Sequence, residues 1–149
     1  MSSTYSVQLT DKRIISSNDT TASEVTSINE GVVNGGRFYF SVKTTGLDDN
    51  HRLYYKIIGD GITTSDFVYL TTELSGWDGP ESVGFIVING DYSSQRIDLS
   101  NDLTTEGLET LKINLYSDAA GTNLLASSNT LTINDFSYGD VTVRNYSKT

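Results

Sequence analysis

Hydrophobic and polar residues alternate with a period of two in short runs along much of the chain. Successive side chains of a strand point to opposite faces of its sheet, so this alternation predicts strands with one buried face. The runs occupy residues 5–9, 38–42, 53–57, 83–87, 96–99, 109–116 and 131–133. Strong helix formers are scarce, whereas β-branched and aromatic residues are common, which favours an all-β fold.

Turn-forming residues separate these runs at roughly 8–12-residue intervals, which is typical of an antiparallel β-sandwich. We therefore expect a sandwich of about seven to nine strands, with a closed barrel as the alternative. A parallel α/β fold is excluded because crossover helices are missing. Asn89-Gly90-Asp91 lies between two alternating runs and predicts a hairpin. Residues 11–36 are poorly periodic and predict an irregular crossing, and residues 64–67 predict a single capped turn.

The length of 149 residues corresponds to one domain. We expect residues 1–137 to form this single sandwich. Residues 138–149 would be a C-terminal extension or an edge strand, because Val141-Thr-Val143 alternates.

The charge balance restricts the classes of partner. Ten Lys and Arg against 19 Asp and Glu give a net charge of −9. This argues against binding nucleic acid, which requires clustered cations, and against an anionic membrane surface. No apolar run is long enough to insert into a membrane, and the N-terminal residues lack the pattern of a secretory signal. There is no Cys, which excludes thiol catalysis and thiolate metal sites.

An acidic segment follows Leu99. Asp102, Glu106 and Glu109 place three carboxylates within eight residues. Ca2+ takes six to eight oxygen ligands from flexible loops, so this segment is a candidate calcium loop. A solvated acidic loop whose carboxylates accept local N–H hydrogen bonds is the other interpretation. No cofactor is otherwise required.

Trp77 is the single tryptophan and lies in Gly76-Trp77-Asp78-Gly79-Pro80. An exposed loop Trp suits sugar stacking or a protein interface, whereas a Trp turned inward would plug one end of the sandwich. The only histidine, His51, is expected in an exposed loop, and no strained G-x-S-x-G turn is present. We therefore expect a protein that is not an enzyme, with no catalytic residues.

Several segments together resemble one Calx-beta repeat. They are Ile28-Asn-Glu30-Gly31 and residues 38–42, 53–57, 62–67, 101–111 and 130–135, of which 101–111 is the most specific. The resemblance implies an immunoglobulin-like β-sandwich. Some members of this family bind Ca2+, and the resemblance adds Glu30 and Asp135 to the candidate ligands Asp102, Glu106 and Glu109. Only Asp135 stands where family members carry a run of aspartates.

This form of the repeat is similar to modules in virion proteins of tailed phages, notably cyanophages, and in bacterial surface adhesins. We expect a virion structural protein, made in the host cytoplasm, that decorates the capsid or tail. It would contact other virion proteins and host surface glycans, through Trp77, Tyr138, Val141 and Val143. The alternative is a Ca2+-dependent adhesion or carbohydrate-binding module on a bacterial cell surface.

Overall fold

The computed structural model describes residues 3–29, 36–68, 72–74, 77–100 and 109–134. In these ranges the regular elements are β1 (Thr4–Thr10), β2 (Ser27–Asn29), β3 (Arg37–Thr45), β4 (His51–Ile58), the 3-10 turn η1 (Thr64–Asp66), β5 (Val83–Ile88), β6 (Tyr92–Asp98), β7 (Glu109–Tyr116), β8 (Leu124–Ser127) and β9 (Leu131–Asn134). Across this part of the chain, no helix is long and apolar enough to cross a membrane.

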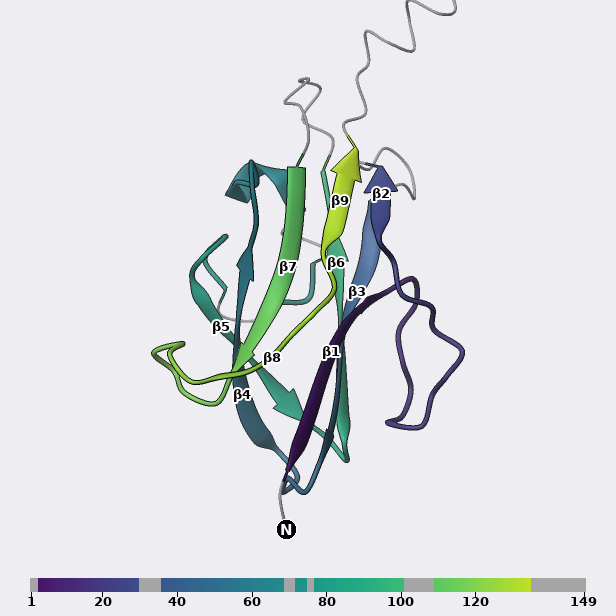
Figure 1. The fold of residues 1–149 in the computed structure, drawn as a ribbon, viewed down its shortest axis with the longest axis vertical. Coiled ribbons are helices and arrows are strands. Elements are labelled where there is room, and N and C mark those ends of the chain that lie inside the picture. The colour runs from purple at the N-terminus through teal and green to yellow at the C-terminus, as the bar shows by residue number, and fades with distance from the viewer. Residues whose placement is uncertain (1–2, 30–35, 69–71, 75–76, 101–108, 135–149) are drawn as a thin grey trace, which may run out of the picture.

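The strands form two sheets that pack face to face (Figure 1). The smaller sheet has the order β1-β3-β6. The larger sheet has the order β2-β9-β7-β4-β5, with β8 also paired to β7. All strand pairs are antiparallel except β2 with β9, which is parallel. The expected all-β, immunoglobulin-like sandwich is confirmed.

The core lies between the sheets and is built from the inward positions of the alternating runs. Its fully buried members include Phe38, Phe40 and Val42 of β3, Leu53, Tyr55 and Ile57 of β4, and Leu111, Ile113 and Leu115 of β7. The rings of Phe40 and Tyr55 meet edge to face with centroids 5.1 Å apart, which joins the smaller sheet to the larger one. The period-two pattern therefore identified the buried faces of β3, β4 and β7 correctly, whereas in β5 the buried positions are Gly84, Ile86 and Ile88 and not Val83, Phe85 and Val87.

The predicted hairpin at Asn89-Gly90 is wrong. Strand β5 pairs with β4 in the larger sheet, and β6 pairs with β3 in the smaller one. The turn, in which Gly90 adopts a φ of +67°, therefore carries the chain from one layer to the other. Alternation specifies which face of a strand is buried but not which strand lies beside it, so the sequence could not separate a hairpin from a crossing.

The poorly periodic crossing, residues 11–36, contains the short strand β2, which the pattern did not predict. The side chain of Asn129 helps to hold this region in place. Its amide oxygen accepts a hydrogen bond from the backbone N–H of Leu9 (3.0 Å), and its amide nitrogen donates to the carbonyl oxygen of Val25 (2.7 Å). Asn129 thus links β1 to the segment that leads into β2.

The predicted capped turn at residues 64–67 is confirmed as η1. The carboxylate of Asp66 accepts a hydrogen bond of 2.7 Å from the backbone N–H of Thr63, and the N–H of Asp66 donates to the Thr63 carbonyl. The backbone N–H of Ser100 also donates to the Asp66 carbonyl (2.8 Å), which fixes η1 beside the end of β6.

Candidate functional site

One end of the sandwich gathers strand ends from distant parts of the sequence. Strands β2 and β9 run parallel and finish together, with Asn29 opposite Asn134. Strand β7 begins at the same end, where Glu109 lies opposite Ile133. In Figure 1 this is the upper end of the molecule, which we call the ligand end.

The smaller sheet contributes to the same end. Arg37 begins β3 opposite Asp98, the last residue of β6. The guanidinium of Arg37 donates to the Asp98 carboxylate (2.7 Å), and the N–H of Leu99 donates to the Gly36 carbonyl (2.9 Å). The end of β6 and the start of β3 therefore lie side by side at the ligand end.

The sequence-predicted calcium residues are all connected to the ligand end through the chain. Glu30 directly follows β2, Asp102 and Glu106 stand between β6 and β7, and Asp135 directly follows β9. These four residues lie outside the described residues. The topology nevertheless brings together three points of the chain that are far apart in the sequence and that lead directly into the segments carrying Glu30, Asp102 with Glu106, and Asp135.

Glu109 is the described member of the predicted set. It opens β7 on an inward position and is 1% exposed. Burial of a carboxylate is unfavourable unless hydrogen bonds or an opposite charge compensate it, so a buried Glu at a strand end requires a specific polar environment. Sequence reasoning grouped Glu109 with two loop residues, whereas the structure places it inside the end of the sandwich.

Within the described ranges, no three Asp, Glu, His or Cys side chains lie close enough together to share a metal ion. Asp66, at 2% exposure, is a second buried carboxylate, which sequence reasoning treated only as a turn cap. His51 is exposed at the start of β4, at the opposite end of the sandwich.

Trp77 is not a contact residue on the surface, and that prediction is wrong. Its side chain is 5% exposed and belongs to the core. The indole ring meets the Phe67 ring edge to face, with centroids 4.8 Å apart. Trp77 therefore plugs the sandwich, because burying a large aromatic surface is more favourable than leaving it in water. The other predicted contact residues, Tyr138, Val141 and Val143, lie outside the described residues, and their role stays a prediction.

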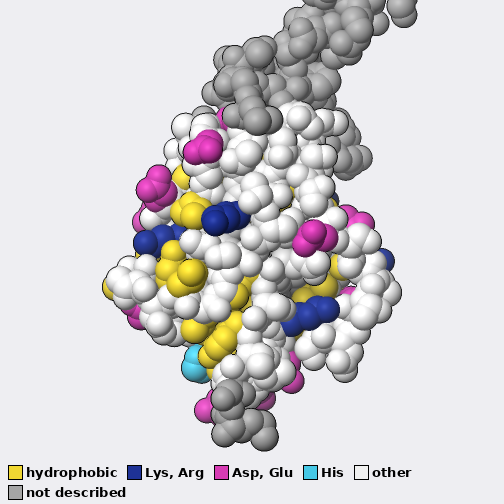
Figure 2. Space-filling model, viewed as in Figure 1, with side chains coloured by type: hydrophobic (Ala, Val, Ile, Leu, Met, Phe, Trp, Pro, Cys, Tyr) yellow, Lys and Arg dark blue, Asp and Glu magenta, His cyan; other side chains and the backbone are white. Residues whose placement is uncertain are grey.

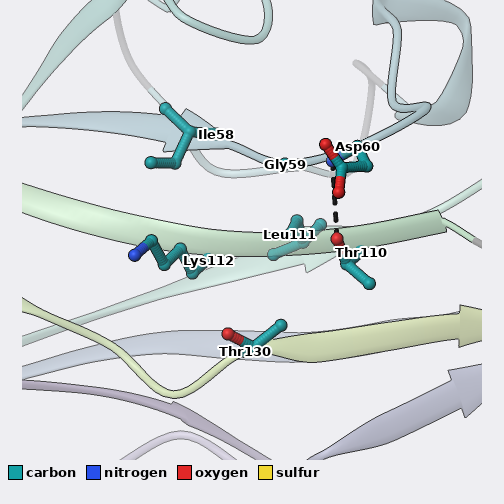
Figure 3. Close-up of a pocket in the computed structure, with 7 residues that line it drawn as sticks. All are labelled: Ile58, Gly59, Asp60, Thr110, Leu111, Lys112 and Thr130. Carbon is teal, nitrogen blue, oxygen red and sulfur yellow. Dashed lines mark hydrogen bonds between the residues drawn. The ribbon is translucent and has the colours of Figure 1, made fainter.

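A surface groove of about 280 Å³ lies between the end of β4 and strand β7 (Figure 3). At the floor of the groove the backbones of Gly59 and Thr110 approach closely, since a Cβ atom on Gly59 would lie 1.8 Å from the Thr110 carbonyl oxygen. The N–H of Thr110 donates to the Asp60 carbonyl (3.1 Å), which holds the two strands together there. Sequence reasoning treated Gly59-Asp60-Gly61 only as a strand end, and no signal in the sequence marked the groove.

The ionisable side chains that line this groove are Asp60 and Lys112. Glycoside hydrolysis uses a pair of carboxyl groups across the substrate, and the described residues that line this groove include one carboxylate, that of Asp60.

No protein-family model matches the chain, and no curated protein is similar enough to count as a relative. Among solved structures, the chain is similar to calcium binding domain CBD12 of CALX1.1 (22% identity, TM-score 0.48), covering 74% of this chain and 41% of that one. It is also similar to the apo form of the Calx CBD1 domain (17% identity, TM-score 0.44), covering 89% of this chain and 98% of that one. CBD12 from CALX1.2 is a third (19% identity, TM-score 0.40), with 74% of this chain and 40% of that one covered. The chain thus spans less than half the length of the two CBD12 chains.

Proposed function

We propose that this protein is a non-enzymatic binding module that takes up Ca2+ at the ligand end. The observation that carries the proposal is the convergence of β2, β9, β7 and β6 at that end, with Glu109 buried there. Each of these strands connects directly to a segment that carries at least one of the predicted carboxylates.

The donor set fits a hard cation. Glu30, Asp102, Glu106, Glu109 and Asp135 offer only carboxylate oxygens, which Ca2+ prefers over nitrogen or sulfur ligands. A bound Ca2+ would neutralise carboxylates that otherwise repel each other on a chain of net charge −9. These residues would then hold three separate connections of the chain against one another, and the ligand end would become more rigid.

Calorimetric titration of the full chain with Ca2+ tests this proposal. We expect measurable heat and, at a Ca2+ concentration 100 times Kd, a stabilisation of about 2.7 kcal/mol. The double variant Asp102→Asn and Glu106→Gln should weaken the affinity by tenfold or more. The control variant Asp48→Asn and Asp91→Asn removes the same charge from exposed positions at the opposite end and should bind Ca2+ as the parent does. Absence of heat at millimolar Ca2+ would refute the proposal.

We further propose that the module acts on a phage particle, as a capsid or tail decoration. An apolar edge strand supports a docking role: β5, with the sequence VGFIVI, ends the larger sheet in the described topology. Edge strands accept an added strand from a neighbouring chain, and Val141-Thr-Val143 has the alternation of such a strand.

Mass spectrometry of purified virions tests the particle setting, and recovery of the chain only from a bacterial cell envelope would favour the adhesin alternative. Deletion of residues 138–149 should abolish attachment to the particle while leaving thermal unfolding of the sandwich unchanged. Full occupancy of the particle by the truncated chain would contradict the role of this segment.

A further inference from the structure

A row of apolar side chains crosses the outer face of the larger sheet. Phe85 of β5 lies opposite Tyr54 of β4, Tyr54 lies opposite Tyr116 of β7, and Tyr116 lies opposite Leu124 of β8. We call these four side chains, three aromatic rings and Leu124, the aromatic row. Adjacent strands are about 4.8 Å apart, so the row is about 14 Å long. Leu124, at one end of the row, is 54% exposed, Tyr54 and Phe85 are half-buried, and Tyr116 is buried beneath its neighbours at 8% exposure.

Cations flank the aromatic row on both sides of Tyr54. Arg52 lies two residues before Tyr54 and places its guanidinium carbon 4.1 Å from the centre of the Phe85 ring. Lys56 lies two residues after Tyr54 and places its amine 5.3 Å from the centre of the Tyr116 ring. Both cations therefore lie over aromatic faces within the range of cation–π attraction.

The distribution of charge on this face differs from that of the whole chain. The outward positions of β4, β5 and β7 carry Arg52, Lys56 and Lys112 and no Asp or Glu, although the chain has 19 acidic residues. Figure 2 shows hydrophobic side chains along this face with Lys and Arg between them, while Asp and Glu lie toward its margins. A cationic, aromatic strip on an acidic protein is complementary to an anionic ligand.

From this arrangement we infer that the aromatic row binds an anionic polysaccharide. Arg52 covers one face of the Phe85 ring and Lys56 covers one face of the Tyr116 ring, so the apolar surface left for the C–H face of a sugar ring is that of Tyr54 and the exposed Leu124. Arg52 and Lys56 are placed to pair with carboxylates of the sugar, and the side-chain amide of Asn114, which donates to the Tyr116 hydroxyl (3.2 Å), adds a polar contact beside the row. The row therefore matches a short stretch of uronic acid residues.

A polysaccharide fits this face better than a nucleic acid. Binding to a phosphate backbone depends on many cations that displace condensed counterions, and this face has three in a chain of net charge −9. A polyuronate carries one carboxylate per sugar, which is a lower charge density than that of duplex DNA, so fewer cations are needed to bind it. The β7–β8 loop bounds the row on its Lys56 side, since Gly121 lies against Lys56 and Val83.

The aromatic row also stabilises the sheet, because cross-strand aromatic pairs do so in any antiparallel sheet. A test must therefore separate binding from folding. Arg52→Gln and Lys56→Gln remove charge but keep most of each side-chain stem, so the sheet should remain folded. Lys12→Gln, at an exposed position in residues 11–36, is the control for the loss of one positive charge.

The experiment is an NMR titration of the full chain with a short oligogalacturonate in EDTA and low salt. EDTA removes Ca2+, so the result does not depend on the ligand end. We expect shifts concentrated at residues of β4, β5 and β7, and an affinity that falls as salt is added. The Arg52→Gln and Lys56→Gln double variant should bind about tenfold more weakly and unfold cooperatively at a Tm only a few degrees lower, because two cation–π contacts are lost, whereas Lys12→Gln should change the affinity less than twofold.

Three results would overturn the inference. The first is no shift at millimolar oligogalacturonate. The second is equal binding of the methyl-esterified, neutral oligosaccharide, which would remove the role of the cations. The third is equal or tighter binding of a single-stranded oligonucleotide with the same dependence on Arg52 and Lys56, which would assign the face to nucleic acid. Because Ca2+ is absent throughout, none of these results bears on the calcium proposal.

Discussion

The hydroxyl group of Tyr55 offers a sharp test of the core. Tyr55 is fully buried on β4, and its hydroxyl oxygen has no hydrogen-bond partner among the described residues. The ring packs on Phe40, and a Cβ atom on Gly84 would lie 2.4 Å from the hydroxyl. Glycine at position 84 therefore provides the space that this ring occupies. The substitution Tyr55→Phe keeps the ring and removes only the oxygen.

The expected magnitude follows from the cost of burying a hydroxyl group. A hydroxyl transferred from water into a protein core without a hydrogen bond costs about 1–3 kcal/mol. Removing the hydroxyl leaves a cavity smaller than a methyl group, and this cavity lowers the free energy of unfolding by at most about 1 kcal/mol. The cavity therefore offsets only part of the gain from removing the buried polar group. We therefore expect Tyr55→Phe to raise the free energy of unfolding by about 1 kcal/mol, although most core substitutions lower it.

The same group makes stability fall at high pH. Burial raises the pKa of the Tyr55 hydroxyl above its ordinary value, because the interior disfavours the phenolate. Ionisation of Tyr55 leaves the free energy of unfolding unchanged below the unfolded pKa of about 10 and lowers it as the pH rises above that value, because only the unfolded chain then releases the proton readily. Each pH unit above 10 should cost about 1.4 kcal/mol, and the Tyr55→Phe variant should not show this loss.

Urea unfolding followed by Trp77 fluorescence measures both effects, since Trp77 is the single tryptophan and is buried in the core. The comparison covers pH 7 to 11.5. Tyr92→Phe, at a half-buried position at the start of β6, is the control and should change stability by less than about 0.5 kcal/mol. A Tyr55→Phe variant less stable than the parent by 1 kcal/mol, or one with the same loss at high pH, would refute the reasoning.

Two further predictions concern side chains that hold the connections between strands. Asn129→Ala leaves the Leu9 N–H and the Val25 carbonyl without their partner and should lower stability by about 2 kcal/mol in urea unfolding, with Asn129→Asp, which keeps only the acceptor, in between. Hydrogen bonds from the hydroxyl of Thr122 and from nearby backbone N–H groups lower the pKa of Asp118 to about 2. The β7–β8 loop should therefore keep its order above pH 4 and lose it as the pH falls toward 2, and an NMR titration midpoint of the Thr122 amide near 4 would contradict this.

Much of the fold could be predicted from local pattern. The alternation in residues 38–42, 53–57 and 109–116 identified the strands and their buried faces, because the period of side-chain direction is a local property of extended backbone. The capped turn at Asp66 was predicted for the same reason, since its hydrogen bond to Thr63 spans three residues.

The sequence predicted which residue types make up the candidate site, namely carboxylates, but not where their side chains lie in the fold. Acidic spacing drew attention to Glu109, but only the packing shows that this side chain faces the interior. Trp77 shows the same error, because a loop flanked by turn residues carries no periodicity from which its burial could be read. The aromatic row was invisible for another reason: Phe85, Tyr54 and Tyr116 are neighbours only through strand register.

The sequence by itself determined that this chain forms strands, which face is buried in strands such as β3, β4 and β7, and that its net charge is negative. These properties depend on residues a few positions apart, where backbone geometry relates position directly to direction. Only the tertiary structure decided that β5 and β6 belong to different sheets, that β2 runs parallel to β9, and that acidic stretches far apart in the chain start from one end. Those facts depend on which strands share hydrogen bonds, and the choice is made by packing of the whole core rather than by any local segment.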